Sequence, residues 1–308
     1  MTAAPTGLAL YDRTAHLGSA QVISHYSTSF GLASRLCSRP VRDHLADVYA
    51  LVRIADEIVD GPAEEAGLAP DERRAMLDAL EVETEQAILR GYSSNLVVHA
   101  FARTARTTGF GRELTRPFFA SMRRDLDPVD FDEAELREYI HGSAEVVGLM
   151  CLRAFSAGVP DNAERDARWQ RGARHLGAAF QKVNFLRDLA DDYGSLGRRY
   201  FPGIDPARLS EADKLRLLDD LDRDLAIAGE VIAELPSGCR RAVAAAHALF
   251  SALSSRLRRT PARELLTTRV SVPTPLKLVL LARAAGGRSR RPSAVTANAR
   301  VPLPGAPA

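Results

Sequence analysis

Apolar residues recur every three to four positions along most of the chain, which is the period of an amphipathic α-helix. No run of alternating β-branched residues bounded by turn residues indicates a β-hairpin. The pattern therefore predicts an all-α fold, a single-domain helical bundle. The predicted helices cover residues 16–36, 40–60, 71–90, 94–109, 112–126, 133–157, 163–193, 210–234, 237–258 and 275–285.

Breaks between these segments agree with the helical pattern. Pro40 suits the first turn of a helix, and Gly61 ends that helix. No internal repeat or linker divides the chain. We expect a flexible N-terminus over residues 1–15, one catalytic domain over 16–286, and a disordered tail over 287–308, where Gly, Pro, Arg and Ala dominate.

Composition narrows the class of protein further. The 308 residues are 46% hydrophobic and carry a formal net charge of only +2, so a nucleic-acid partner is not expected. Cys37, Cys151 and Cys239 lie far apart in sequence and outside any CxxC spacing, which indicates neither a disulfide framework nor a zinc site. Without a signal peptide or a spanning apolar segment, we expect a cytoplasmic protein, either soluble or peripheral on the inner membrane face.

Two helices combine acidic side chains with apolar stripes. In the first helix, a projection at 100° per residue places Tyr49, Arg53, Asp56 and Asp60 in one broad sector with apolar neighbours. The opposite side is also mixed in character. This helix is therefore predicted to lie inside the molecule with a polar end.

The second acidic helix has polar residues at spacings of three, four and four. Gln181, Asn184, Asp188 and Asp192 share one face, and Phe185 lies among them. An aromatic residue on an amide and carboxylate face argues against simple solvation. That face is predicted to line a cavity.

Acids four residues apart on a helix are commonly solvated or paired with nearby arginines, and for either pair alone this is the stronger interpretation. Like charges at this spacing destabilise a helix by about a few tenths of a kcal/mol unless a cation compensates. Two such pairs together favour magnesium chemistry, because Mg²⁺ is held by one or two carboxylates plus substrate phosphates. Ions bridging the pairs would neutralise a departing diphosphate, with Arg53 and Arg187 adding hydrogen bonds.

At these residues the sequence resembles the squalene/phytoene synthase family, the head-to-head condensing prenyltransferases. The resemblance covers residues 20–290 and implies the isoprenoid synthase fold, an α-helical bundle around a central cavity. Four blocks carry it, with weaker similarity in SMRRDLD: YSTSFGLAS, VYALVRIADEIVDG, YIHGSAEVVGLM, and LGAAFQKVNFLRDLADD with RRYFP.

Carried over by motif, the resemblance assigns the catalytic and metal-binding positions. The Mg²⁺ ligands, with Mn²⁺ as an alternative ion, would be the carboxylates of Asp56, Asp60, Asp188 and Asp192. Around the diphosphates would lie Ser27, Ser29, Tyr49, Arg53, Gln181, Asn184, Arg187, Arg198 and Tyr200. His141 departs from the commonest family pattern, which leaves the terminating base unassigned.

The residues of these motifs are most similar to those of the actinobacterial phytoene synthases. It implies a transferase of carotenoid biosynthesis that condenses two geranylgeranyl diphosphates to phytoene through a cyclopropyl diphosphate, without NADPH. A squalene or dehydrosqualene synthase that uses farnesyl diphosphate is the alternative, because these motifs do not set chain length. Further alternatives are a non-catalytic scaffold, or else a terpene cyclase or head-to-tail prenyltransferase. The first conflicts with the presence of all four aspartates, and the second with DEIVD in place of DDxxD. A lipid substrate also implies contact with a membrane surface.

Overall fold

The computed structural model describes residues 6–27, 29–127, 130–189 and 200–286. Within these residues the regular elements are helices, as predicted. The longer helices are α1 (Leu8–Tyr26), α3 (Arg39–Val59), α5 (Pro70–Arg90), α6 (Leu96–Thr108), α7 (Arg112–Arg124), α9 (Val146–Ser156), α10 (Ala163–Arg187), α12 (Glu211–Val231), α13 (Ser237–Arg259) and α14 (Thr274–Ala285). The shorter elements are α2 (Ser29–Ser34), α4 (Pro62–Glu65), α8 (Glu133–Ile140), the π-helical turn η1 (His141–Glu145), and the 3₁₀ turns η2 (Pro206–Arg208), η3 (Ile232–Glu234) and η4 (Ala262–Leu266).

Most predicted helices agree with the structure to within a few residues. The helix predicted over 163–193 ends earlier, at Arg187, with Asp188 as its C-cap, and the N-terminal helix also differs. The sequence predicts one helix over 16–36, whereas the structure has two, α1 and α2, separated near Ser27. Residues 8–15, assigned above to a flexible N-terminus, form the first turns of α1. The expected tail over 287–308 lies outside the described residues.

The early start of α1 has a tertiary cause. The Tyr11 hydroxyl donates to the carbonyl oxygen of Ser93 at 2.9 Å, and Asp12 pairs with the buried ring of His99 at 2.7 Å. Both partners lie more than 80 residues away along the chain. Periodicity within one segment does not reveal such contacts, so the first turns of α1 were missed.

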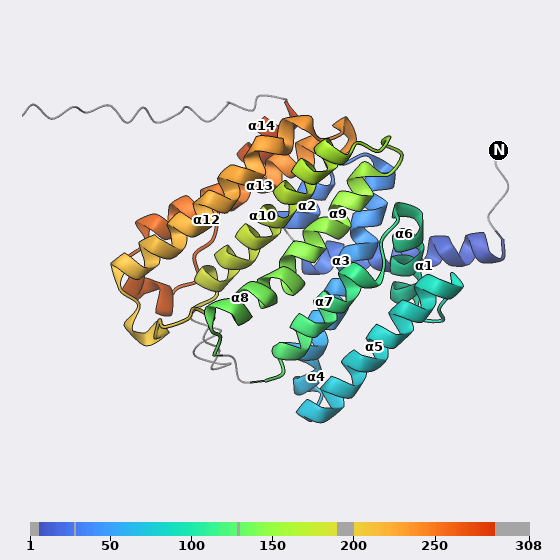
Figure 1. Cartoon of the computed structure of the whole chain (residues 1–308), viewed down its shortest axis with the longest axis horizontal. Helices are drawn as coiled ribbons and strands as arrows, with labels where there is room; N and C mark the ends of the chain where they lie inside the picture. The colour runs from blue at the N-terminus through green and yellow to red at the C-terminus, as the bar shows by residue number, and fades with distance from the viewer. Residues whose placement is uncertain (1–5, 28, 128–129, 190–199, 287–308) are drawn as a thin grey trace, which may run out of the picture.

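Helix α9 lies between the two acidic helices predicted from the sequence. Both α3 and α10 pack against α9. Figure 1 shows that α3 and α10 run in the same direction, so that their C-terminal ends lie at the same end of the bundle. One large core cluster joins α10, α12 and α13, and another joins α3, α5, α6, α7 and α9. The acidic ends of α3 and α10 are thereby anchored to separate cores.

Close helix packing around α9 depends on glycines. A β-carbon at Gly177 of α10 would lie 2.5 Å from the carbonyl oxygen of Ala144, and one at Gly148 would lie 2.5 Å from that of Ala173. At Gly142 a β-carbon would lie 2.2 Å from the carbonyl oxygen of Pro117 in α7. Backbone cannot yield to such overlap as a flexible side chain can, so only glycine permits these approaches.

The three cysteines, distant in sequence, belong to one hydrophobic cluster and are free thiols. Burial raises the pKa of Cys37 to about 11 and the pKa values of Cys151 and Cys239 to about 12. The thiols are therefore protonated near neutral pH and contribute as small apolar side chains.

Over the described ranges, no helix is both long and apolar enough to cross a lipid bilayer.

Candidate active site

Aspartates cap the C-terminal ends of both α3 and α10. Asp60 is the C-cap of α3 and donates its N–H to the carbonyl oxygen of Asp56 at 2.8 Å, and Asp188 makes the equivalent bond to Asn184 at 2.8 Å. A helix C-terminus carries partial negative charge, so a carboxylate there is unfavourable and a cation is favourable. Both ends therefore attract positive charge, which is what binding of a metal diphosphate requires.

At the end of α3, one arginine joins the acids to an aromatic ring. Arg53 donates from Nη1 to Oδ2 of Asp56 at 2.7 Å and also pairs with Glu57. Its guanidinium carbon lies 4.7 Å from the ring centroid of Tyr26. The Nε of Arg53 is buried and has no hydrogen-bond partner among the residues that the structure describes. A buried N–H donor of this kind is available to an anionic ligand.

The junction of α1 and α2 brings a predicted serine to Tyr49. The Tyr49 ring stacks on Phe30 with centroids 5.8 Å apart, and its hydroxyl is hydrogen-bonded to Ser27. Ser27 Oγ also accepts the N–H of Gly31 at 3.2 Å. Burial raises the pKa of Tyr49, which keeps the phenol neutral. Ser29 begins α2, and only its backbone is described.

At the end of α10, two arginines bind Asp188. Arg187 donates from Nε to Oδ1 of Asp188 at 2.9 Å, and Arg269 donates from Nε to the same oxygen at 2.7 Å. Arg269 comes from the segment before α14, 81 positions further along the chain. Sequence reasoning missed it, because nothing in its local spacing links it to the acidic motif.

The polar face of α10 is more mixed than the sequence predicted. Gln181 and Asn184 are half-buried. Phe185, however, is buried, and its ring stacks on Tyr200 with centroids 4.0 Å apart. Its ring centroid lies 6.1 Å from that of Tyr139. Phe185 therefore belongs to an aromatic cluster of the core. Its burial agrees with the expectation that this face of α10 is not simply solvated.

That aromatic cluster joins two further motifs to the end of α10. The Tyr139 hydroxyl donates to Asp125 Oδ1 at 2.7 Å, which links the YIHGSAEVVGLM block to SMRRDLD. Tyr200, predicted to contact diphosphate, is buried against Phe185, Phe131 and Tyr139. The cluster fixes the helix end that carries Asp188.

The donor set fits Mg²⁺. Carboxylate oxygens are hard ligands, and Mg²⁺ keeps several waters and needs only one or two protein carboxylates together with substrate phosphates. Within the part of the chain that the structure describes, no three His, Cys, Asp or Glu side chains form a ready-made metal centre. Asp56, Asp60 and Asp188 suit an ion that arrives with its diphosphate. Asp192 and Arg198 lie outside the described residues.

His141 is engaged elsewhere. Its Nδ1 lies 2.9 Å from Glu145 Oε2, and Arg174 of α10 donates to the same oxygen at 2.8 Å. The three side chains form an ionic network across η1 and α10. This arrangement accounts for His141 without a catalytic role.

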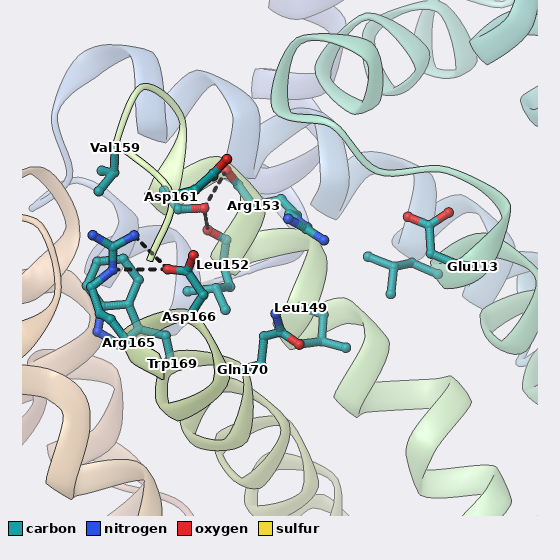
Figure 2. A pocket seen from close by; sticks show the side chains of 12 residues that line it. Glu113, Leu149, Leu152, Arg153, Val159, Asp161, Arg165, Asp166, Trp169 and Gln170 are labelled. Carbon is teal, nitrogen blue, oxygen red and sulfur yellow. Dashed lines mark hydrogen bonds and ion pairs between the residues drawn. The ribbon is translucent and has the colours of Figure 1, made fainter. Parts of the chain in front are cut away.

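A pocket of about 220 Å³ lies at the other end of α10, between the start of α7, the second half of α9 and the first turns of α10. Figure 2 shows Arg165 over Trp169 and bonded to Asp166, with Arg153 and Glu113 on the far side. The Arg165 guanidinium carbon lies 4.5 Å from the Trp169 ring centroid. The lining includes none of the predicted site residues, so this pocket is separate from the acidic helix ends.

Comparisons with known proteins agree with this geometry. Residues 23–275 match the family model described as squalene/phytoene synthase. The 15-cis-phytoene synthase of Paracoccus sp. (strain N81106 / MBIC 01143) is 30% identical over 298 residues, covering 90% of this chain and 94% of that protein. The presqualene diphosphate synthase of Rhodopseudomonas palustris is 29% identical and covers 79% of each chain. The phytoene synthase of Mycobacterium tuberculosis is 31% identical and covers 64% of this chain and 62% of its own length.

Solved structures show the same fold. A dehydrosqualene synthase in complex with ligand matches with a TM-score of 0.75 and 21% identity, covering 90% of this chain and 98% of its own. A squalene synthase from Alicyclobacillus acidocaldarius matches with a TM-score of 0.69 and 21% identity, covering 81% of this chain and 95% of its own. The bundle is thus the isoprenoid synthase fold. The chain belongs to the squalene/phytoene synthase family and is a prenyltransferase of the head-to-head condensing kind.

Proposed function

We propose that the protein is a phytoene synthase. Two geranylgeranyl diphosphates condense head to head to a cyclopropylcarbinyl diphosphate, with loss of one diphosphate and one proton. A second ionisation and rearrangement release the other diphosphate and a second proton, giving phytoene without a reductant. The observation that carries this choice is the 30% identity to a 15-cis-phytoene synthase across 94% of that protein's length.

The acidic ends of α3 and α10 bind the metal and the diphosphate in this proposal. Asp56 and Asp60 on one side, and Asp188 and Asp192 on the other, hold Mg²⁺ with the substrate diphosphate. Bound Mg²⁺ supplies positive charge that stabilises the leaving diphosphate. Arg53 donates its buried Nε–H to diphosphate oxygens, and Arg187 adds charge-assisted hydrogen bonds from the α10 side.

The remaining predicted residues orient the diphosphate. Tyr49 and Ser27 share a hydrogen bond near Arg53 and present neutral hydroxyl groups. Asn184 and Gln181 lie one and two turns before Asp188 on the same helix, where their amides support the second site. Ser29, Arg198 and Tyr200 complete the proposed set. Tyr200 acts there mainly by fixing Phe185 and the end of α10.

A farnesyl-diphosphate-using enzyme is the second candidate. The observation in its favour is the 29% identity to a presqualene diphosphate synthase. In that case the same residues would form the C₃₀ cyclopropyl intermediate, and either stop there or continue to squalene or dehydrosqualene. The acidic helix ends serve both candidates equally, because they contact diphosphate and not the hydrocarbon chain.

Incubation of the purified chain with each diphosphate and Mg²⁺, with and without NADPH, separates the two candidates. We expect a C₄₀ product of the mass of phytoene from geranylgeranyl diphosphate without NADPH, identified by mass spectrometry. Turnover of farnesyl diphosphate alone would overturn the phytoene synthase proposal. Chelation by EDTA should abolish either reaction, and added Mg²⁺ should restore it.

A further inference from the structure

Helix α14 presents an apolar face to solvent. Leu276, Leu278 and Val279 are 37%, 55% and 46% exposed, and no residue of the helix is buried. At 100° per residue, these three side chains share the outward side with Ala282 and Arg283. Exposed apolar side chains grouped in this way mark an interaction surface more often than scattered ones do.

The opposite face of α14 is already in use. Leu281 and Ala284 pack with Ala33 of α2 and Ala245 of α13, and Leu280 packs against the core around α13. The helix is therefore attached to the protein along one side only. Its outward side carries the exposed Leu276, Leu278 and Val279.

Charge distribution indicates the nature of that contact. Residues 235–308 contain 13 of the 41 basic residues of the chain but only one of its 39 acidic residues, Glu264. Helix α14 packs against α2 and α13, and these three helices contain no acidic residue. The charges of α14 itself are those of Lys277 and Arg283. A partner surface with negative charge is thus attracted and is not repelled by any side chain of these helices.

We propose that the outward face of α14 docks onto an anionic lipid bilayer. With 12 residues the helix is about 18 Å long, which is too short to span a membrane. It suits a position in the plane of the interface, with Leu276, Leu278 and Val279 among the acyl chains and Arg283, on the same outward side, extending to the lipid phosphates.

This surface is connected to both candidate diphosphate sites, so the inference deepens the proposed function and rests on it for its biological purpose. Arg269, five residues before α14, binds Asp188. Helix α2, against which α14 packs, begins two residues after Ser27. A membrane bound at α14 would hold both ends of the site near the phase that dissolves the isoprenoid chains.

Vesicle flotation of the full chain tests the surface without any isoprenoid present, so the result does not depend on the enzymatic activity. Vesicles of phosphatidylcholine with 30% phosphatidylglycerol should carry the wild-type protein, and vesicles of phosphatidylcholine alone should carry much less. The double variant L278E/V279E should bind the anionic vesicles at least about tenfold more weakly. A rise to 1 M salt should also weaken wild-type binding.

The matched control is V82E/L89E on α5, where the two side chains are 53% and 78% exposed. It introduces the same charges at exposed apolar positions and should bind vesicles like the wild type. If L278E/V279E does not fold, shown by circular dichroism, R283E provides a milder test at an exposed position.

Three outcomes would overturn the inference. The first is equal binding of the wild type and the α14 variants to anionic vesicles. The second is equal weakening by the α5 control. The third is a monomer-to-dimer difference between wild type and L278E/V279E in light scattering without vesicle binding, which would make α14 a contact between two copies of the chain. Loss of vesicle binding with unchanged turnover in detergent would leave the proposed reaction intact.

Discussion

Helix α3 carries aspartates in two different settings. Asp47, near its middle, is 3% exposed; it accepts a hydrogen bond from Thr104 at 2.8 Å and pairs with His16 at 3.0 Å. Asp56 and Asp60 lie at the C-terminal end, where Asp56 is half-buried beside Arg53 and Asp60 is exposed. The carboxylate in the middle is bonded by neighbouring helices, whereas those at the end lie where the helix dipole favours a cation. The position along α3, and not the helix face alone, thus distinguishes the buried Asp47, which bonds neighbouring helices, from the proposed metal ligands Asp56 and Asp60.

The largest expected effect comes from removing a charge at the helix ends. D188N or D56N should lower turnover by about a thousandfold or more, because each removes a proposed Mg²⁺ ligand. The thermal unfolding midpoint should stay equal or rise slightly, since a negative charge at a helix C-terminus is lost. Product formation and circular dichroism measure the two effects. Activity within tenfold of wild type would refute the metal assignment.

Changing the aspartate in the middle of α3 should have the opposite pattern. D47A leaves the buried Thr104 hydroxyl and His16 without their carboxylate, which should cost about 3 kcal/mol of unfolding free energy. Turnover per folded molecule should change less than about threefold. Chemical denaturation and active-site-normalised kinetics test this. A large loss of turnover in the folded variant would mean that Asp47 acts in the chemistry.

Arg269 tests whether the contact seen at Asp188 extends to the substrate. R269Q should raise KM for the diphosphate by about tenfold, because one charge-assisted hydrogen bond is lost. Stability should hardly change, since the arginine side chain is 60% exposed and such pairs contribute little. R263Q, at a nearby exposed position, is the matched control. Equal kinetics of the two variants would remove Arg269 from the site.

The smallest effect is a pH dependence at His16. A hydrogen bond to Asp47 raises the pKa of His16, with further attraction from Asp47 and Asp43, while burial and Arg103 oppose it. The stabilisation is therefore complete below the unfolded pKa of about 6.5 and is lost as pH rises through the folded value. H16Q should cost about 1 kcal/mol at pH 6 and less at pH 9. A difference that grows with pH would contradict this sign.

Much of the fold followed from local periodicity. The interior position of α3, with buried residues around its circumference, and the long α10 were both predicted from the repeat of apolar positions. The start of α1 was not, because Tyr11 and Asp12 are fixed by residues of a distant segment. The local pattern predicts a helix well when the helix buries an apolar stripe of its own. It predicts the helix ends less well when a polar contact with a distant segment determines where the helix begins.

The contacts of the candidate site are likewise of two kinds: those that local spacing predicted and those that join segments distant in sequence. Arg53 and Asp56, three residues apart on one helix, are paired as their spacing suggested. The bond between Ser27 and Tyr49, and the contact of Phe185 with Tyr200, join segments whose relation no helical projection contains. The contact of Arg269 with Asp188 depends on the three-dimensional path of the chain between them, 81 positions long, and could not be predicted from local spacing.

The glycine contacts around α9 restrict how this enzyme can change. Gly177 brings the backbone of α10 against η1, Gly148 brings α9 against α10, and Gly142 of η1 approaches α7, so the spacing of these elements admits no added methyl group. An alanine at any of the three positions would have to push backbone segments apart, so we expect it to lower the free energy of unfolding. We therefore expect variants with altered substrate length to be found among the larger side chains and not among these glycines.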